Sequence, residues 1–275
     1  PRRQTKKNWG DSVAPPPGRK PRPADKISGA VLYVERLPGR SPATAEQRRH
    51  YLLALPRWLA RRGHCPWPEG REIYKPTVPE SNPKAWRKEQ LAAILATCKK
   101  LEGRIDGIRA SAWWRGLFLA LWDTGERISA ILAATWDNYD RDAGTLYVPA
   151  SDRKGKKKAM IYHLRGDSQE ALRLIYGHRE RIFPWPYHWV TIYNRLRKIN
   201  KLAGLPTDRK SKFHRMRVSF ASHLEAAGGN ATDALRHTSR RGTVESYLDR
   251  TITQPEPPNR KLFRIDESPP MPPEV

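Results

Sequence analysis

Apolar residues recur every three to four positions along much of the chain, which is the spacing of one face of an α-helix. Beyond position 80 this pattern first predicts two long helices, over residues 84–101 and 108–123, and a short one over 127–134. Helical spacing returns further along, where it predicts helices over residues 169–176, 190–203, 215–227 and 231–236 and around Tyr247. The second part of the chain is therefore expected to be mainly helical.

The period changes in the middle of this helical region. Residues 145–149 and 159–164 have the short, alternating pattern of β-strands, and the loop 150–158 between them is rich in lysine. These segments predict an antiparallel hairpin. The expected fold class is mainly α with a small antiparallel β-sheet, an α+β fold.

The composition points to a polyanionic partner. The chain has 275 residues, and 52 Lys and Arg against 28 Asp and Glu give it a formal charge of +24. This excess is far larger than solubility requires, so nucleic acid is the leading candidate partner. The two cysteines, Cys65 and Cys98, are too few for a disulfide framework and are interpreted as structural thiols. Because neither a long apolar run nor a signal-peptide core occurs, we expect a cytoplasmic protein without a membrane partner.

Prolines and charges divide the chain into segments. Residues 1–30, with six prolines and eight Lys or Arg, are expected to form a disordered basic arm. Residues 31–62 are expected to form a small, partial helical DNA-binding domain. Within it, residues 43–62 predict a helix whose apolar positions are Tyr51, Leu52, Leu55 and Leu59. The remaining segments are a Pro-rich linker at 63–83, the main domain at 84–250 and a Pro-rich C-terminal tail at 251–275.

Candidate chemistry follows a fixed order within the main domain. Arg127 comes directly after a Thr-Gly-Glu sequence, at the start of a predicted helix. His214 and Arg217 are three residues apart, so they share one face of the next candidate helix. His237 follows in a Leu-Arg-His-Thr-Ser segment, and Tyr247 comes ten residues later.

In this order the segments resemble the tyrosine recombinase, or phage integrase, family over about residues 80–250. The resemblance implies one catalytic set: Arg127 as the first arginine, His214 and Arg217 as the His-x-x-Arg pair, His237 as the second histidine and Tyr247 as the nucleophile. The family also has a hairpin lysine. Lys154, which precedes Gly155, matches it best, and Lys156 is the alternative.

The ordered set carries this resemblance, since each motif alone is short. The His-x-x-Arg spacing occurs three times in the chain, beginning at His178, His214 and His237. The chain also departs from the family pattern. Arg236 stands where a glycine is common, Ala130 replaces a frequent glutamate, and the interval before His237 is about one helical turn short.

The resemblance implies a site-specific DNA recombinase, or integrase, that cleaves and rejoins strands through a 3′-phosphotyrosyl intermediate without a cofactor or a metal. Arg127 and Arg217 would hold the phosphate, His214 would accept the phenol proton, His237 would donate a hydrogen bond and Lys154 would protonate the departing 5′ oxygen. The implied partners are double-stranded DNA and a homotetramer on two DNA sites. Two alternatives stay open: strand nicking and resealing as in a type IB topoisomerase, and a noncatalytic DNA-binding relic of the family.

Overall fold

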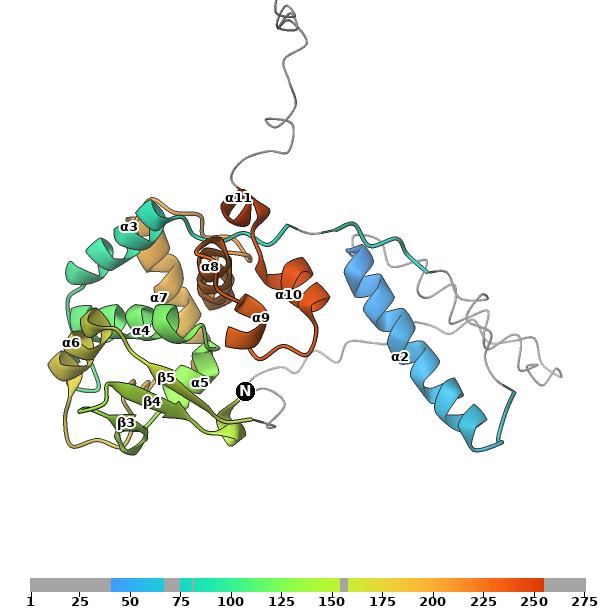
Figure 1. Cartoon of the computed structure of the whole chain (residues 1–275), viewed down its shortest axis with the longest axis horizontal. Helices are drawn as coiled ribbons and strands as arrows, with labels where there is room; N and C mark the ends of the chain where they lie inside the picture. The colour runs from blue at the N-terminus through green and yellow to red at the C-terminus, as the bar shows by residue number, and fades with distance from the viewer. Residues whose placement is uncertain (1–40, 67–74, 81, 154–157, 255–275) are drawn as a thin grey trace, which may run out of the picture. The chain divides into compact units, whose positions relative to one another are not determined.

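The computed structural model describes residues 41–66, 75–80, 82–153 and 158–254. The chain forms two compact units, Pro1–Glu80 and Ser81–Val275, which we call the N-terminal and C-terminal units (Figure 1). The expected basic arm, all but the first few residues of the expected tail, part of the linker segment, and both Lys154 and Lys156 lie outside the described residues. In the part of the chain that is described, no helix has the length and apolar character needed to cross a membrane.

The N-terminal unit contributes one described helix, α2 (Pro42–Arg61). Its start is set by Ser41, whose side chain accepts a hydrogen bond from the backbone N–H of Thr44, and by proline at the first helical position. The expected apolar stripe is wrong in part, because Tyr51 and Leu55 are 68% and 63% exposed whereas Leu53 is buried. Leu53 lies on the opposite side of the helix, since two residues advance the chain by more than half a turn.

The C-terminal unit has the expected α+β composition, so the predicted fold class is confirmed. Its helices are α3 (Lys88–Lys99), α4 (Ala110–Thr124), α5 (Ile128–Ala133), α6 (Gly166–Ile175), α7 (Trp189–Leu202), α8 (Phe213–Ala226), α9 (Ala231–Ala234), α10 (Arg240–Tyr247) and α11 (Arg250–Thr253). Each predicted helix of this unit is present, with its ends displaced by a few residues. The last, α11, reaches into the segment expected to be a tail.

The largest displacement is at the start of α3, which begins at Lys88 and not at residue 84. The backbone N–H of Ala85 donates to Asp249 and that of Trp86 donates to Ser219, at 2.9 and 2.7 Å. These bonds tie the segment before the helix to distant parts of the chain, and the helix begins only after Arg87, whose backbone is extended. Sequence periodicity contains no sign of such partners.

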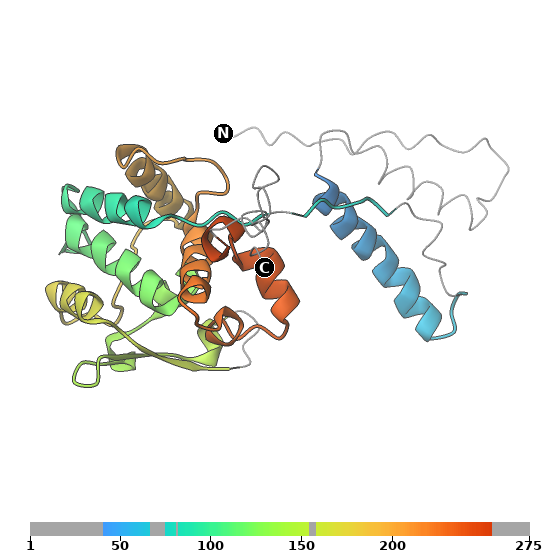
Figure 2. The same cartoon turned by 45° about the horizontal axis from the view of Figure 1, so that its top comes forward.

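Helix α4 runs through the centre of the core (Figures 1 and 2). It packs against α3, α6 and α8, and its Trp113, Leu117 and Leu121 are at most 1% exposed. The ring of Trp113 meets those of Trp114, Phe183 and Trp185 at centroid distances of 5.0 to 5.9 Å. A helix buried on most sides is apolar nearly all round, which explains why this segment was easy to predict.

Within the described residues, five short strands form two antiparallel sheets. They are β1 (Arg104–Ile105) and β2 (Ile108–Arg109) in one, and β3 (Tyr139–Asp140), β4 (Thr145–Val148) and β5 (Met160–His163), in that order, in the other. The predicted hairpin is β4–β5. The apolar pattern does not predict β1, β2 or β3, because strands of two residues are too short to show alternation.

The pairing of β4 with β5 directs one tyrosine toward the interior. Leu146 lies opposite Tyr162, and both are buried, whereas their neighbours Tyr147 and Ile161 are exposed. Side chains alternate between the faces of a sheet, so this register fixes which ones point inward. The phenol of Tyr162 thereby reaches the turn that follows α4.

That turn depends on Gly125, the residue that ends α4 in a left-handed conformation with φ of +60°. A Cβ atom at this position would lie 2.3 Å from the ring of Phe220 on α8. Both the backbone angle and the close approach therefore require glycine. The turn sets Glu126 and Arg127 directly beside α8, where the candidate chemistry is found.

Candidate active site

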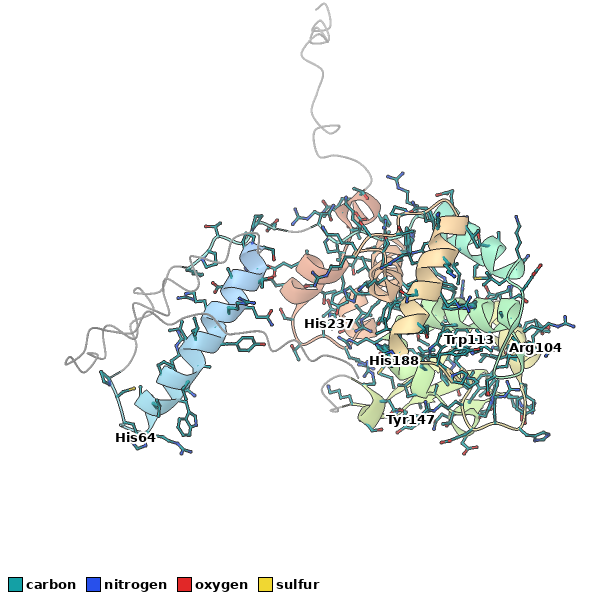
Figure 3. All side chains as sticks on the ribbon, turned by 180° about the vertical axis from the view of Figure 1, so that it is seen from behind. His64, Arg104, Trp113, Tyr147, His188 and His237 are labelled. Atoms are coloured by element: carbon teal, nitrogen blue, oxygen red, sulfur yellow. The ribbon has the colours of Figure 1, made fainter. Side chains whose placement is uncertain are left out.

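Five of the six candidate side chains come together in one region of the C-terminal unit, around α8 and α10. Arg127 comes from the turn before α5, His214 and Arg217 from the first half of α8, His237 from the loop after α9, and Tyr247 from the last residue of α10. Figure 3 labels His237 within this region. Both candidates for the hairpin lysine lie outside the described residues.

Arg217 is buried at the floor of the site, with 2% of its surface exposed. Its Nη1 donates to the carbonyl of Gly125 at 2.6 Å, and its Nη2 donates to the carbonyl of Leu235 at 3.3 Å. The Nε–H is buried without a hydrogen-bond partner. An unsatisfied buried donor costs free energy, and the Nε–H groups of Arg57 and Arg215 are buried without a partner in the same way.

His237 has a hydrogen-bond pattern that fixes its protonation. Its Nε2 lies 3.3 Å from Nη2 of Arg217, and its Nδ1 lies 3.0 Å from Oγ1 of Thr243. Because a guanidinium can only donate, Nε2 is an acceptor and the ring proton sits on Nδ1, facing Thr243. The Thr243 hydroxyl in turn donates to the carbonyl of Ser239 at 3.2 Å. The ring is therefore held as the neutral Nδ1–H form.

Tyr247 lies against both candidate histidines. Its ring centroid is 5.1 Å from that of His214 and 4.5 Å from that of His237, and the guanidinium carbon of Arg217 lies 5.4 Å from the same centroid. The phenol is partly exposed, so it faces the two imidazoles and the arginine without being closed off from solvent. This places a phenol, two imidazoles and a guanidinium around one small volume.

Both candidate histidines have a lowered pKa. The pKa of His214 is lowered by the loss of hydration among neighbouring protein atoms and by the positive charges of Arg217 and Arg127, although part of its surface stays exposed. The same causes lower the pKa of His237. Both imidazoles are therefore neutral at neutral pH. The charge of Arg127 thus lies close enough to lower the pKa of both histidines, as that of Arg217 does.

The backbone next to Tyr247 is anchored by two polar residues. Ser222 donates from Oγ to the carbonyl of Tyr247 at 3.2 Å and accepts from the N–H of Asp249 at 2.8 Å. Asp249, which is 3% exposed, accepts from the N–H of Ala85 through its carboxylate. Neither residue was singled out in the sequence, because their partners lie far away along the chain.

The left-handed turn before His237 explains one departure from the family pattern. Arg236 has φ of +53°, in the region that glycine adopts without strain. A glycine at this position would therefore suit the backbone, and arginine occupies it at a conformational cost of about 1 kcal/mol. The short helix α9 and this turn still bring His237 to Arg217, so the shortened interval does not displace the histidine.

Glu126 is a site residue that the sequence reasoning missed. It is 2% exposed, and its carboxylate accepts from the Tyr162 hydroxyl at 2.6 Å, from Nε of Arg153 at 2.5 Å and from the N–H of Arg127 at 3.2 Å. Its Oε2 is also 3.7 Å from Nη1 of Arg217. The signal available was an acidic residue between Gly125 and Arg127 in a segment where Ala130 lacks the usual glutamate.

The electrostatics of Glu126 favour the carboxylate form. Burial alone would raise its pKa, but the hydrogen bond from Tyr162, the charges of Arg153 and Arg217 and the N–H of Arg127 together lower it below the ordinary value. Glu126 thus provides the negative charge that lets Arg217 remain buried. Through Arg153 it also ties the base of the β4–β5 loop to the floor of the site.

Glu126→Gln is expected to lower the free energy of unfolding by about 2–3 kcal/mol at pH 7, because it leaves two buried or half-buried cations without their counter-charge. The folded-state pKa is lowered, so the stabilisation exists above the ordinary pKa of glutamic acid and is lost as the pH falls through the folded value. Urea titrations of both proteins should therefore converge in acid. A difference that stays constant from neutral to acidic pH would contradict the ion-pair account.

Glu170→Gln is the matched control. Glu170 pairs with Arg173 at 3.5 Å on the surface, with both side chains more than half exposed. Such a pair contributes at most about 0.5 kcal/mol. Its replacement should leave the unfolding curve almost unchanged at every pH.

Metal ligands are not grouped in this site. Among the residues that the structure describes, no three His, Cys, Asp or Glu side chains cluster in a way that could hold a metal ion. The polar groups around Tyr247 are cationic or neutral, as a site for a phosphate group requires.

Solved structures of DNA recombinases resemble this fold. A Tn1549 transposon integrase variant in complex with a circular intermediate DNA gives a TM-score of 0.63 at 15% identity, over 81% of this chain and 80% of that one. The XerH site-specific recombinase, bound to a palindromic difH substrate, gives a TM-score of 0.60 at 19% identity, over 83% of this chain and 69% of that one. A lambda integrase dimer bound to a COC′ core site gives a TM-score of 0.58 at 17% identity, over 89% of this chain and 82% of that one. At these identities the likeness establishes the fold.

Sequence comparison is more specific. The search of curated proteins found no match to the chain. The model of the phage integrase family, however, matches residues 84–252, which is more than half of the chain and includes every residue of the candidate site. With the fold and this match together, the resemblance inferred from the ordered motifs is confirmed: the chain belongs to the phage integrase family.

Proposed function

We propose that this chain is a site-specific DNA recombinase that cleaves and rejoins DNA strands with Tyr247 as the nucleophile. The observation that carries the proposal is the convergence of a buried arginine with an unused donor, two neutral histidines and a tyrosine. The formal charge of +24 supports a DNA partner. So do the three structural neighbours, each of which was solved bound to DNA.

In the proposed step, the phenolic oxygen of Tyr247 attacks a phosphorus atom of the DNA backbone. A bond forms between this oxygen and phosphorus, and the bond from phosphorus to the 5′ oxygen breaks. The products are a 3′-phosphotyrosyl linkage and a free 5′ hydroxyl. One phosphodiester replaces another, so the step needs no external energy source and is reversed when a 5′ hydroxyl attacks the linkage.

The arginines stabilise the charge that develops in this step. A phosphodiester resists attack because its anionic oxygens repel a nucleophile and gain charge in the transition state. Arg217 is held by the carbonyls of Gly125 and Leu235, and Arg127 adds its charge from the turn that contains Gly125. Fixed cations of this kind need no reorganisation when the charge appears.

The histidines handle protons. Phenols are largely protonated at neutral pH, so Tyr247 needs a proton acceptor, and neutral His214 stands beside it. His237 accepts from Arg217 in the free site. The negative charge of a bound phosphate favours protonation of its Nε2, and the resulting N–H donates to a nonbridging oxygen. Lys154, outside the described residues, is assigned to protonate the departing 5′ oxygen by its match to the family pattern.

Recombination requires that the free 5′ hydroxyl attack a linkage on a second DNA site. Exchange of both strands at two sites then takes four protomers, which is the assembly we propose for the active complex. A topoisomerase-like enzyme would reseal the same strand and would need only one site. A requirement for two sites separates the two outcomes.

The proposal is tested by covalent trapping. The full chain is incubated with nicked duplexes taken from the DNA that flanks its gene, and the products are separated on a denaturing gel. We expect a protein–DNA adduct that protease digestion removes. DNA that is demonstrably bound but never becomes attached to the protein would instead favour the noncatalytic relic.

A further inference from the structure

A second cationic site lies at the opposite end of α4 from Tyr247. A cavity of about 470 Å³ is formed there by the end of α3, the β1–β2 hairpin, the first turn of α4 and the end of α6. In Figure 3, Arg104, which lines this cavity, and His237 lie at opposite sides of the C-terminal unit. Helix α4 is itself about 22 Å long, and the cavity lies at its first turn whereas Gly125, which contacts Arg217, lies at its end.

The lining of this cavity is unusually basic. Its charged side chains are Lys99, Arg104, Arg109, Arg115 and Arg179, and no aspartate or glutamate lines it. Five of twelve lining residues are therefore cationic, whereas Lys and Arg make up 52 of the 275 residues of the chain. Like charges gathered in a concave surface raise the local positive potential above that of a flat surface.

Interactions within the described part of the protein do little to compensate the charges of these five cations. Among the described residues, none of them forms an ion pair, and the hydrogen bonds of Arg104 and Arg179 go to the carbonyls of Gly107 and Ile175. Lys99 and Arg109 are exposed. Their mutual repulsion is a cost that the fold does not offset with acidic side chains, and a bound polyanion would offset it.

We propose that this cavity is a phosphate-binding pocket, separate from the cleavage site, which holds two or more phosphate groups of a polyanion. The favoured source is the DNA backbone, at a distance from the cleaved phosphate or on a second duplex. A soluble polyphosphate offers the same chemistry and is the alternative source.

The test compares two variants of the full chain that lose the same charge. Lys99→Gln/Arg109→Gln removes two pocket cations for which the structure shows no side-chain hydrogen bond. Arg195→Gln/Lys198→Gln removes one arginine and one lysine from the exposed side of α7, outside the cavity. Affinity for a long duplex is measured by fluorescence anisotropy at several salt concentrations, and binding of inorganic tripolyphosphate is measured by calorimetry.

We expect the pocket variant to bind DNA about tenfold more weakly, with a salt slope smaller by about 1 to 2, and the control variant to resemble the wild type. If the pocket variant loses only its binding of tripolyphosphate, the result supports a phosphate-binding pocket whose ligand is a soluble polyphosphate. An equal loss of binding in both variants, or no loss in either, would overturn the proposal of a phosphate-binding pocket. Adduct formation on a short nicked duplex reports separately on Tyr247, so a failed pocket and a failed cleavage mechanism give different results.

Discussion

Replacing Tyr247 by phenylalanine is expected to abolish the covalent adduct completely while DNA affinity stays within about twofold of wild type. The substitution removes the attacking oxygen together with the hydrogen bond between this hydroxyl and Arg217, and it keeps the ring contacts with His214 and His237. A partly exposed phenol contributes about 0.5–1 kcal/mol at most to the free energy of unfolding, so the variant should remain folded. The measurement is the covalent trapping experiment on nicked duplexes, with DNA binding followed in parallel.

Tyr193→Phe provides the control for this substitution. Tyr193 is a partly buried tyrosine on α7 whose ring packs against Trp189 and Phe213, and burial raises its pKa. Its ring contacts with Trp189, Phe213 and Lys212 involve no candidate site residue, so the adduct should form at the normal rate. If the adduct persisted in Tyr247→Phe, the nucleophile would be another residue and the proposed mechanism would be wrong.

Arg217→Lys is expected to slow adduct formation by about 10²- to 10³-fold, the usual effect of removing one preorganised donor to a developing oxyanion. Lysine keeps the positive charge, but it cannot reproduce the planar fork that donates to Gly125 and Leu235 while leaving Nε–H free. The change should appear in the rate of a single cleavage event at saturating protein. An unchanged rate would show that charge alone suffices.

A control on the same helix separates loss of chemistry from loss of stability. Arg215 lies over the Trp86 ring at 3.6 Å and donates to the carbonyl of Ala85, so it supports the start of the C-terminal unit. Arg215→Lys should lower the melting temperature without a comparable effect on cleavage at a temperature where the protein is folded. Arg217→Lys should affect both, because its side chain is buried as well as catalytic in our proposal.

Local patterns predicted those parts of the fold that local forces determine. Helices such as α4 and α7 have regular apolar spacing, and the β4–β5 hairpin alternates along a buried face, so each could be recognised. The start of α3 could not, because Asp249 and Ser219 bind its backbone from far along the chain. The side of α2 that faces solvent could not be recognised either, since single apolar residues such as Tyr51 and Leu55 are often exposed on protein surfaces.

The candidate site shows the same division. Arg127, His214, Arg217, His237 and Tyr247 could be found because family motifs preserve their order along the chain. Glu126 and Asp249 could not, because their roles consist of contacts between distant segments. A carboxylate becomes a counter-charge or an anchor only when tertiary structure brings cations or free N–H groups to it, as Arg153 on the hairpin does for Glu126.

The anchoring of α10 also determines how the C-terminal unit folds and opens. The segment that carries Tyr247 rests on a small apolar cluster of its own, formed by Ala221, Ala231, Leu235 and Leu248, separate from the core around α4. The bond from Ala85 to Asp249 joins residues 164 positions apart, so closing it orders a long stretch of chain and belongs late in folding. By the same reasoning, this end of the unit exchanges its amide hydrogens through local opening while α4 stays protected. Tyr247, the nucleophile in our proposal, thus stands on a segment with a smaller apolar cluster than the one around α4, and we expect its amide hydrogens to exchange faster.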